Sequence, residues 1–257
     1  MAGMDAPLYP DSNDENVWAH WSRGNYGPGD WSGSHNDLAA GVDLYHTDHS
    51  RAGISVMHTN SSLDRTENLG EVSMKKKFTR VSLYGRHDFA GGLHAAGDVF
   101  AGGIRIKDTS LVDMSTRTAG VHAEVCVDVP AGRGTITPLV RAAYASIRGF
   151  TTRDGEGFPF TMKESHYSSF SAGLKASLPL SPVSLLTAYA GWGIRTGYDI
   201  DGTMSDAWNT MDISESGKEH VKTLGIGYRC DVTPFARLSL SAAREFSSGL
   251  HDDWNFQ

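Results

Sequence analysis

The feature that most constrains the fold is a strict alternation of small or apolar residues with polar ones over long stretches of the chain. In the segment AGVHAEVCVDV, residues 119–129, every odd-numbered residue is Ala or Val, and His122, Glu124, Cys126 and Asp128 stand between them. Side chains point alternately to the two faces of a β-strand, so a period of two predicts strands with one apolar and one polar face. The pattern recurs along the chain without a competing helical period, and an all-β fold is therefore predicted.

Eleven segments show this alternation, and a stub near the C-terminus is a candidate for one more strand. The connections alternate in length along the chain, so that short turns gather at one end and long polar loops at the other. Short turns are predicted at 47–51, 90–92, 130–133, 179–182 and 233–234, and long loops at 25–35, 63–75, 107–115, 148–164 and 198–217. The predicted strands are 16–24, 36–46, 52–62, 76–89, 92–106, 116–129, 134–147, 165–178, 183–197, 218–232 and 235–247, with the stub at 253–257.

An up-and-down meander with two unequal ends is typical of outer-membrane barrels, whereas soluble sandwiches mix their turn lengths. No apolar run approaches the roughly 18 residues of a membrane-spanning helix, but strands of this length can cross a bilayer at a tilt. A sheet in hydrocarbon must close, because its edge groups have no other partners. The sequence thus predicts one antiparallel up-and-down transmembrane β-barrel of about 12 strands over residues 16–257, with a last strand too short to span.

The parity of each strand separates an apolar face from an ionic face. The apolar face includes Leu83, Val140, Leu174 and Leu240, and many Ala and Gly residues lie between such positions. One interpretation is a soluble sheet with this face in a core and the charges in solvent; the other is a barrel with lipid outside and a wet interior. Persistence over eleven strands favours the barrel, since unpaired charges are costly in a packed core. The residues expected to line its lumen are Asp43, Arg80, Arg86, Asp88, Asp98, Glu124, Arg141, Lys175, Arg195, Arg229, Arg237 and Glu245.

In the barrel interpretation these charges line a hydrated path, although they could equally pair with one another and only fill the bore. His94 and His122 share the lumen parity with Asp98 and Glu124, which keeps a barrel hydrolase with His as base as an alternative. The histidines lack metal or triad spacing, and YDIDGT at 198–203 lacks the spacing of a calcium-binding EF-hand. Neither catalysis nor a cofactor or metal is therefore expected.

Charge and the N-terminal residues bear on partners and location. The net charge of −7 argues against nucleic acid, because phosphate binding needs a basic stripe. Lys75–Lys77 is a short basic run near a strand end, which anionic lipid headgroups or simple solvation could explain. Residues 1–15 contain neither an apolar segment nor a cleavage signal, and we interpret them as a short leader or linker remnant. The chain is then either cytosolic or a piece of a longer exported precursor.

From about Val17 to Gln257 the chain resembles the translocator domain of autotransporters, the type V secretion family. The resemblance rests on the order and spacing of several segments more than on any one of them. These are NDLAAGVDLYHTDHSRAGISVMHTNSSLD, SLYGRHDFAGGLHAAGDVFAGG, AGVHAEVCVDVPAGRGTITPLVRAAY, VSLLTAYAGWGIRTGYD and FARLSLSAAREFSSGLHDDW.

This resemblance implies a monomeric, non-enzymatic 12-stranded barrel in the bacterial outer membrane, with loops at the cell surface and termini in the periplasm. It implies that the barrel lets an N-terminal passenger polypeptide, outside these residues, reach the surface, and that a barrel-assembly machinery inserts it. Family members hold a linker helix in the pore, but residues 1–15 do not resemble a long helix. A pore for small solutes is the alternative function on the same fold.

Overall fold

The structure, a computed structural model, describes residues 17–26, 31–67, 70–108, 113–153, 158–197, 200–205, 210–215, 217–233, 236–247 and 252–256. Residues 1–15, which the sequence predicts to be a leader remnant, lie outside this range, so that prediction is untested. Within the described residues, no helix is both long enough and apolar enough to span a membrane.

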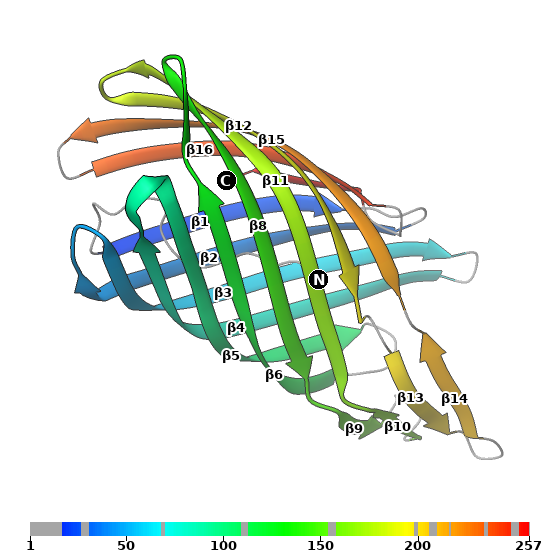
Figure 1. The fold of residues 1–257 in the computed structure, drawn as a ribbon. Coiled ribbons are helices and arrows are strands. Elements are labelled where there is room, and N and C mark those ends of the chain that lie inside the picture. Colours follow the sequence, from blue (N-terminus) through cyan, green and yellow to red (C-terminus); the bar gives the residue numbers. More distant parts are fainter. Residues whose placement is uncertain are drawn as a thin grey trace.

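The main sheet is antiparallel, has 13 strands and closes on itself through the pairing of β8 with β11 and of β17 with β1 (Figure 1). One of the 13, β7 (Val129–Ala131), pairs only with β8, so twelve strands form the ring, as predicted. In spatial order the ring strands are β1 (Val17–Tyr26), β2 (Trp31–His46), β3 (Ser50–Glu67), β4 (Gly70–Asp88), β5 (Leu93–Asp108), β6 (Asp113–Val127), β8 (Gly134–Ile147), β11 (Ser165–Ser181), β12 (Ser184–Thr196), β15 (Lys218–Thr233), β16 (Ala236–Ser247) and β17 (Asp252–Phe256).

The apolar face of the ring points outward. Leu83, Val140, Leu174 and Leu240 expose 58%, 43%, 55% and 57% of their surface, respectively, which contradicts the soluble sheet with an apolar core. Register aligns such residues in rows across strands; one row holds Ile54, Leu83, Val99 and Val121. The outer wall of the barrel is therefore an apolar belt suited to hydrocarbon.

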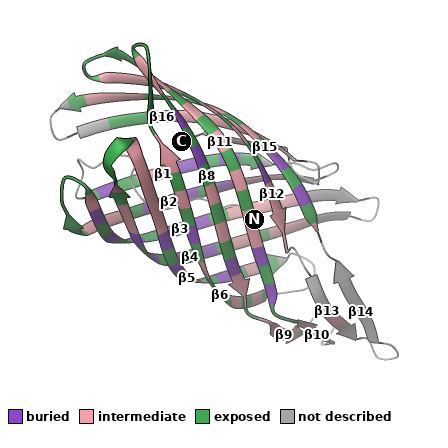
Figure 2. Cartoon of the chain, viewed as in Figure 1, coloured by how far each residue is buried: buried purple, intermediate pink, exposed green. Residues whose placement is uncertain are grey.

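The inner side of β1–β5 is packed rather than wet. Arg80 is 0% exposed and Arg51 2% exposed, and both lie among inward aromatic side chains such as Phe78, Tyr84 and Phe100. Figure 2 shows this difference, with buried bands on the strands of this wall, whereas intermediate and exposed residues alternate along most of β11 and β12. The sequence predicts a wet interior throughout, but bulky inward residues such as Trp18 and Tyr84 pack against one another and fill this side.

The two ends of the barrel differ, although not in the way that the loop lengths predict. At one end, here called the turn end, short connections follow β2, β4, β7 and β11, where Gly91 and Gly132 take positive φ values of 78° and 61°. At the other end, the hairpin end, β3 and β4 continue as a paired hairpin to Glu67 and Gly70, through the loop predicted at 63–75. Beyond a membrane both faces of a hairpin meet water, so strands can continue there without alternation.

The loops predicted at 148–164 and 198–217 contain four further strands. They form a separate sheet in the order β14 (Thr210–Glu215), β13 (Ile200–Ser205), β10 (Pro159–Met162) and β9 (Phe150–Arg153). The pairing of β10 with β13 joins two connections that are far apart in sequence. The hairpin end therefore carries an ordered second sheet, which we call the loop sheet (Figure 1).

Candidate functional site

The inner face of the barrel brings most of the predicted lumen residues into groups. The first group centres on Asp43 of β2, whose carboxylate accepts a hydrogen bond from the Tyr84 hydroxyl at 2.5 Å and lies 3.3 Å from Nη2 of Arg51. The indole Nε1 of Trp18 donates to the Tyr84 hydroxyl at 3.1 Å. Because these residues come from β1, β2, β3 and β4, the group joins four neighbouring strands across the inner side. It fixes this wall rather than leaving Asp43 free for a ligand.

A second group surrounds Asp98 of β5. Nδ1 of His122 lies 2.8 Å from Oδ1 of Asp98, and the imidazole stacks on Phe100 with the ring centroids 5.2 Å apart. The guanidinium of Arg80 lies over the Phe100 ring at 4.9 Å. All four side chains are buried. The Arg80 guanidinium is stabilised there by the face of the Phe100 ring.

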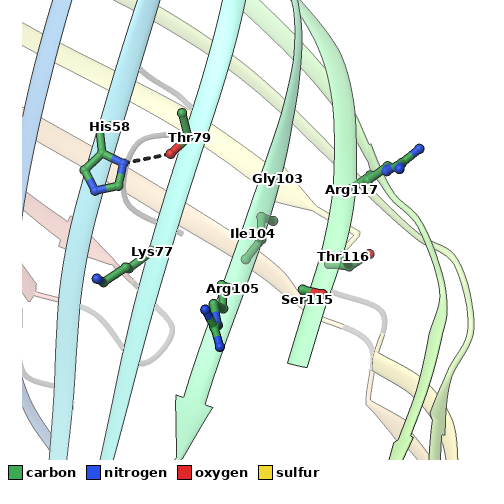
Figure 3. A pocket seen from close by; sticks show the side chains of 9 residues that line it. All are labelled: His58, Lys77, Thr79, Gly103, Ile104, Arg105, Ser115, Thr116 and Arg117. Carbon is green, nitrogen blue, oxygen red and sulfur yellow. Dashed lines mark hydrogen bonds between the residues drawn. The ribbon is translucent and has the colours of Figure 1, made fainter. Parts of the chain in front are cut away.

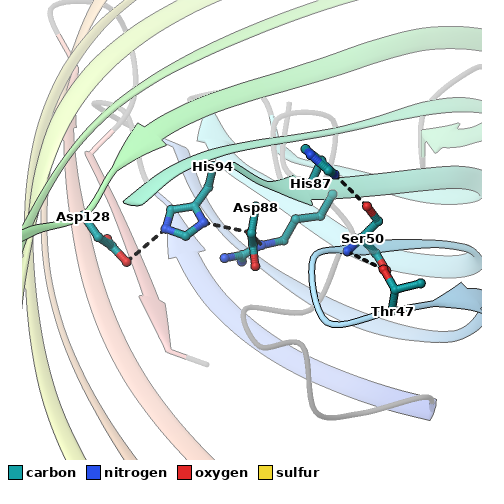
Figure 4. Close-up of polar contacts among 7 residues, drawn as sticks. Thr47, Ser50, His87, Asp88, His94 and Asp128 are labelled. Carbon is teal, nitrogen blue, oxygen red and sulfur yellow. Dashed lines mark hydrogen bonds and ion pairs between the residues drawn. The ribbon is translucent and has the colours of Figure 1, made fainter. Parts of the chain in front are cut away.

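A third group lies towards the turn end and is shown in Figure 4. Arg86 donates through Nε to Asp88 at 2.9 Å, and His94 lies between two carboxylates. Nδ1 of His94 is 2.8 Å from Asp88, and its Nε2 is 3.1 Å from Asp128. Both ring nitrogens of His94 thus contact carboxylates, and these contacts connect β4, β5 and the turn after β6.

The remaining pairs bridge the other side of the ring. Arg141 of β8 forms a close ion pair with Glu124 of β6. Arg195 of β12 makes a two-pronged contact with Glu245 of β16, in which Nη2 donates to Oε2 at 2.8 Å, and its Nη1 lies 3.8 Å from Glu219 of β15. This second pair crosses over β15, which requires both side chains to point inward.

Three predicted lumen residues lie outside these groups. Lys175 and Arg229 are half-buried on the inner parity of β11 and β15. Arg237 lies at the start of β16, where the structure describes no side chain, so its prediction remains untested. The lining role of all twelve residues is taken up below as a proposal.

The inner wall of β11, β12, β15 and β16 is built mainly from small residues. Register places Ser177, Thr187, Gly227 and Ser241 in one inward row. A second row holds Gly173, Gly191, Thr223 and Glu245. These side chains are half-buried, whereas those facing them from β2–β5 are mostly buried and larger. The bore is therefore lined asymmetrically, with one bulky wall and one wall of mostly small residues, on which the Tyr189 ring packs over Gly173 and Gly191.

Sequence reasoning missed several partners of the lumen charges. Arg51 was placed just before its strand, but β3 begins at Ser50 and turns Arg51 inward. Tyr84 and Trp18 have the inner parity, but they carry no charge, and the lumen residues predicted from the sequence are all charged. Glu219 shares the inner parity of Arg229, and parity alone could have identified it.

The hydrolase alternative finds no support in these groups. His94 contacts two carboxylates, and His122 contacts a carboxylate and stacks on an aromatic ring. The described residues also hold no cluster of three or more His, Cys, Asp or Glu side chains suited to a metal ion. A ring of long tilted strands with an apolar outer belt and an ion-paired interior defines the class of outer-membrane β-barrels.

Comparison with known proteins narrows this class. The family described as Autotransporter beta-domain matches residues 16–243, so the chain belongs to that family. Its function is that of an outer-membrane translocator for a passenger polypeptide, the function expected from the sequence resemblance. A search of curated proteins finds no match.

Several solved structures share the fold at low sequence identity. The transport unit of the autotransporter AIDA-I from Escherichia coli has a TM-score of 0.73 at 15% identity, covering 97% of this chain and 90% of that one. The beta domain of the Bordetella autotransporter BrkA has a TM-score of 0.68 at 15% identity, and the match covers 94% of this chain and 97% of that one. The translocator domain of the autotransporter NalP from Neisseria meningitidis has a TM-score of 0.62 at 15% identity, and the match covers 96% of this chain and 88% of that one.

Proposed function

We propose that the passenger polypeptide crosses the barrel along the inner wall of β11, β12, β15 and β16. The observation that carries this proposal is the asymmetry of the bore, in which small, half-buried side chains on these four strands face a packed wall on β2–β5. An extended chain needs width and hydrogen-bonding groups along its route. Ser, Thr and Gly side chains leave width, and the hydroxyls exchange hydrogen bonds with a passing backbone.

The twelve predicted lumen charges have two roles in this proposal. Those on β2–β6, such as Asp43, Arg80 and Asp98, are buried in the bulky wall and hold it rigid through their contacts. Those beside the small wall, such as Lys175, Arg195 and Glu245, present mixed-sign charge to the route. Mixed charge keeps the route hydrated and offers no extended apolar surface on which a passenger would stall.

The same proposal orients the barrel. β1 begins at the turn end, because Val17 pairs with Val42 close to the turn after β2, and β17 runs back towards that end. A passenger joined before β1 therefore starts at the turn end. We place the turn end in the periplasm and the hairpin end with its loop sheet at the cell surface, because outer-membrane barrels generally have short periplasmic turns and longer extracellular loops. In this proposal the barrel works as a monomer without catalysis, and a barrel-assembly machinery inserts it.

A bulky side chain on the small wall tests the route. Gly225 faces inward between Tyr189 and Ala243, and a Cβ added there would meet Ala243 Cβ at 3.4 Å, an ordinary contact. With a reporter passenger fused before residue 17, Gly225→Phe should lower surface display several-fold, because the ring occupies the route. Display is measured by protease accessibility of the reporter on intact cells.

The matched control is Ala172→Phe, which adds the same ring to the exposed outer face of β11. It should leave display unchanged, and both variants should keep the heat-modifiable gel migration of a folded barrel. Normal display by folded Gly225→Phe would exclude this wall as the route. Equal losses in both variants would show that the added ring acts on the barrel as a whole, and would also contradict the proposed route.

A further inference from the structure

The outer surface of β4, β5 and β6 carries a dense group of cations directly above the apolar belt. Register defines the boundary: Val81 lies in a row with Val56, Ala101 and Ala119, and the next rows towards the hairpin end are polar. The three rows beyond that boundary contain Lys75, Lys77, Arg105, Lys107 and Arg117, all exposed, against one described outward carboxylate, Asp113. We call these five cations the basic patch.

The members of the patch differ in how far their charge is compensated. Asp113 accepts hydrogen bonds from Nε and Nη2 of Arg105 at 2.9 Å and 2.6 Å, and lies 3.3 Å from Nζ of Lys107. Among the described residues, no carboxylate forms an ion pair with Lys77 or Arg117. Within the same part of the chain, no such pair forms with Lys75 either, so the patch keeps a strong positive excess. The uncompensated charges nearest the apolar belt are those of Lys77 in β4 and Arg117 in β6.

A groove lies between these two residues and is shown in Figure 3. It has a volume of about 450 Å³ and is lined by Lys77, Thr79, Gly103, Arg105, Arg117 and His58, among others. Gly103 opens its floor. Register places Gly103 between Thr79 and Arg117, and a Cβ built on it would find its nearest neighbour only at 3.9 Å, so neither backbone conformation nor crowding requires a glycine there. The missing side chain leaves room at the centre of the patch.

The height of the groove on the barrel wall selects its ligand. Residues two apart in a strand are separated by roughly 7 Å, so Arg117 lies about one such step above the row of Val81, and Lys77 and Arg105 about two. A ligand in the groove thus has cations around it and exposed apolar side chains directly beneath it. A free anion would contact only the cations. A lipid with a phosphate headgroup would contact the cations through its headgroup and the apolar residues Val56, Val81 and Ala101 through its acyl chains.

We propose that this groove binds the phosphate-bearing headgroup of an anionic membrane lipid. Lys77 supplies a compact ammonium charge, Arg117 supplies guanidinium donors that match phosphate oxygens, and Thr79 adds a hydroxyl from the same row as Arg117. His58 Nδ1 lies 2.7 Å from Thr79 Oγ1, which orients that hydroxyl. The inference depends on the outer-membrane location of the barrel and not on the route of the passenger.

The test measures lipid binding to the purified full chain in neutral detergent by native mass spectrometry. The probes are lipid A, phosphatidylglycerol, phosphatidylcholine and inorganic pyrophosphate. Lys77→Gln with Arg117→Gln removes the two uncompensated charges nearest the apolar belt, and Gly103→Leu fills the groove without a change of charge. Lys218→Gln with Lys222→Gln is the matched control, because it removes two exposed cations from β15 on another part of the wall.

Lipid A or phosphatidylglycerol should bind the unaltered chain more tightly than phosphatidylcholine. The charge variant should weaken this binding roughly thirtyfold, as expected for the loss of two cations near an anionic surface. The Gly103 variant should weaken it several-fold, and the control should retain it. Equal binding of phosphatidylcholine, or an equal loss in the control, would overturn the proposal. Full competition by pyrophosphate at matched phosphate concentration would also overturn it, since the apolar belt would then contribute nothing.

Loss of lipid binding by variants that still display a passenger is the expected pattern. If all variants and the unaltered chain bind no anionic lipid yet display the passenger, the lipid site is wrong and the translocator function is unaffected. Heat-modifiable migration of each variant verifies that the barrel is folded.

Discussion

Single ion pairs in this barrel differ in the water that surrounds them, and this difference sets their contribution to stability. Arg195 is 18% exposed at its side chain and lies between Glu245 and Glu219, which are 13% and 7% exposed. Arg105 and Asp113 are 55% and 46% exposed at the outer surface. A charge left without its partner is costly where water is scarce and inexpensive where water replaces the partner.

Arg195→Ala should therefore destabilise the barrel by about 3 kcal/mol, because it leaves two poorly solvated carboxylates on neighbouring strands facing each other. The free energy of unfolding is measured by urea titration of barrels refolded in lipid vesicles. The control Arg105→Ala should leave the free energy of unfolding nearly unchanged, since water surrounds its pair. A similar loss for both variants would mean that water reaches the inner pair as freely as the outer one.

At the scale of strands, the alternation of apolar and polar residues is sufficient to predict a strand wherever one of its faces meets lipid. The segment 119–129 alternates without a break, and β6 spans most of it with Val121 and Val125 outward and His122 inward. The alternation ends where the belt ends, and the polar stretch 63–75 was therefore predicted as a loop although it is mostly paired strand. Beyond the belt both faces meet water, so nothing in the hydropathy of the residues distinguishes a hairpin from a loop.

Parity predicts the face of a residue but not its partner, which depends on register. The register of β2 and β3 shifts between Asp43 and Tyr45, so the residues beyond the shift pair one place out of step. Arg51 pairs there with His46, yet its guanidinium reaches Asp43. No local pattern in the sequence marks this bulge. The sequence could therefore predict that Asp43 faces inward but not that Arg51 and Tyr84 hold it.

The loop sheet provides a prediction at the scale of elements. Thr161 of β10 pairs with Thr151 of β9 on one side and Thr203 of β13 on the other, so β10 is an inner strand of that sheet. Thr161→Pro removes a backbone donor and should open the sheet while the barrel stays closed. Trypsin should then cleave faster after Arg153 and Lys163, with heat-modifiable migration unchanged.

Thr161→Val is the control for that experiment, because it keeps the backbone donor and loses only the 3.1 Å contact between the Thr151 and Thr161 hydroxyls. It should be cleaved at nearly the unaltered rate. Equal resistance of the proline variant would show that β10 does not hold the loop sheet together.

For the whole molecule, closure and direction together give the barrel a defined inside, outside, entrance and exit. Closure follows from the pairing of β8 with β11 and β17 with β1, which leaves the belt facing outward around the ring. Direction follows from the chain, since β1 starts at the turn end and the loop sheet lies at the hairpin end. In the proposed route, a polypeptide attached before β1 crosses from the turn end towards the hairpin end.

This direction can be measured with single cysteines in a Cys126→Ser, Cys230→Ser background. Lys163→Cys lies beside the loop sheet and Arg133→Cys in the turn before β8, and both positions are exposed. A membrane-impermeant maleimide should label Lys163→Cys on intact cells and Arg133→Cys only after the outer membrane is permeabilised, because the belt between them separates the two sides. The reverse pattern would keep the fold but invert the barrel, and a passenger attached before β1 would then start outside the cell and could not be exported by this route.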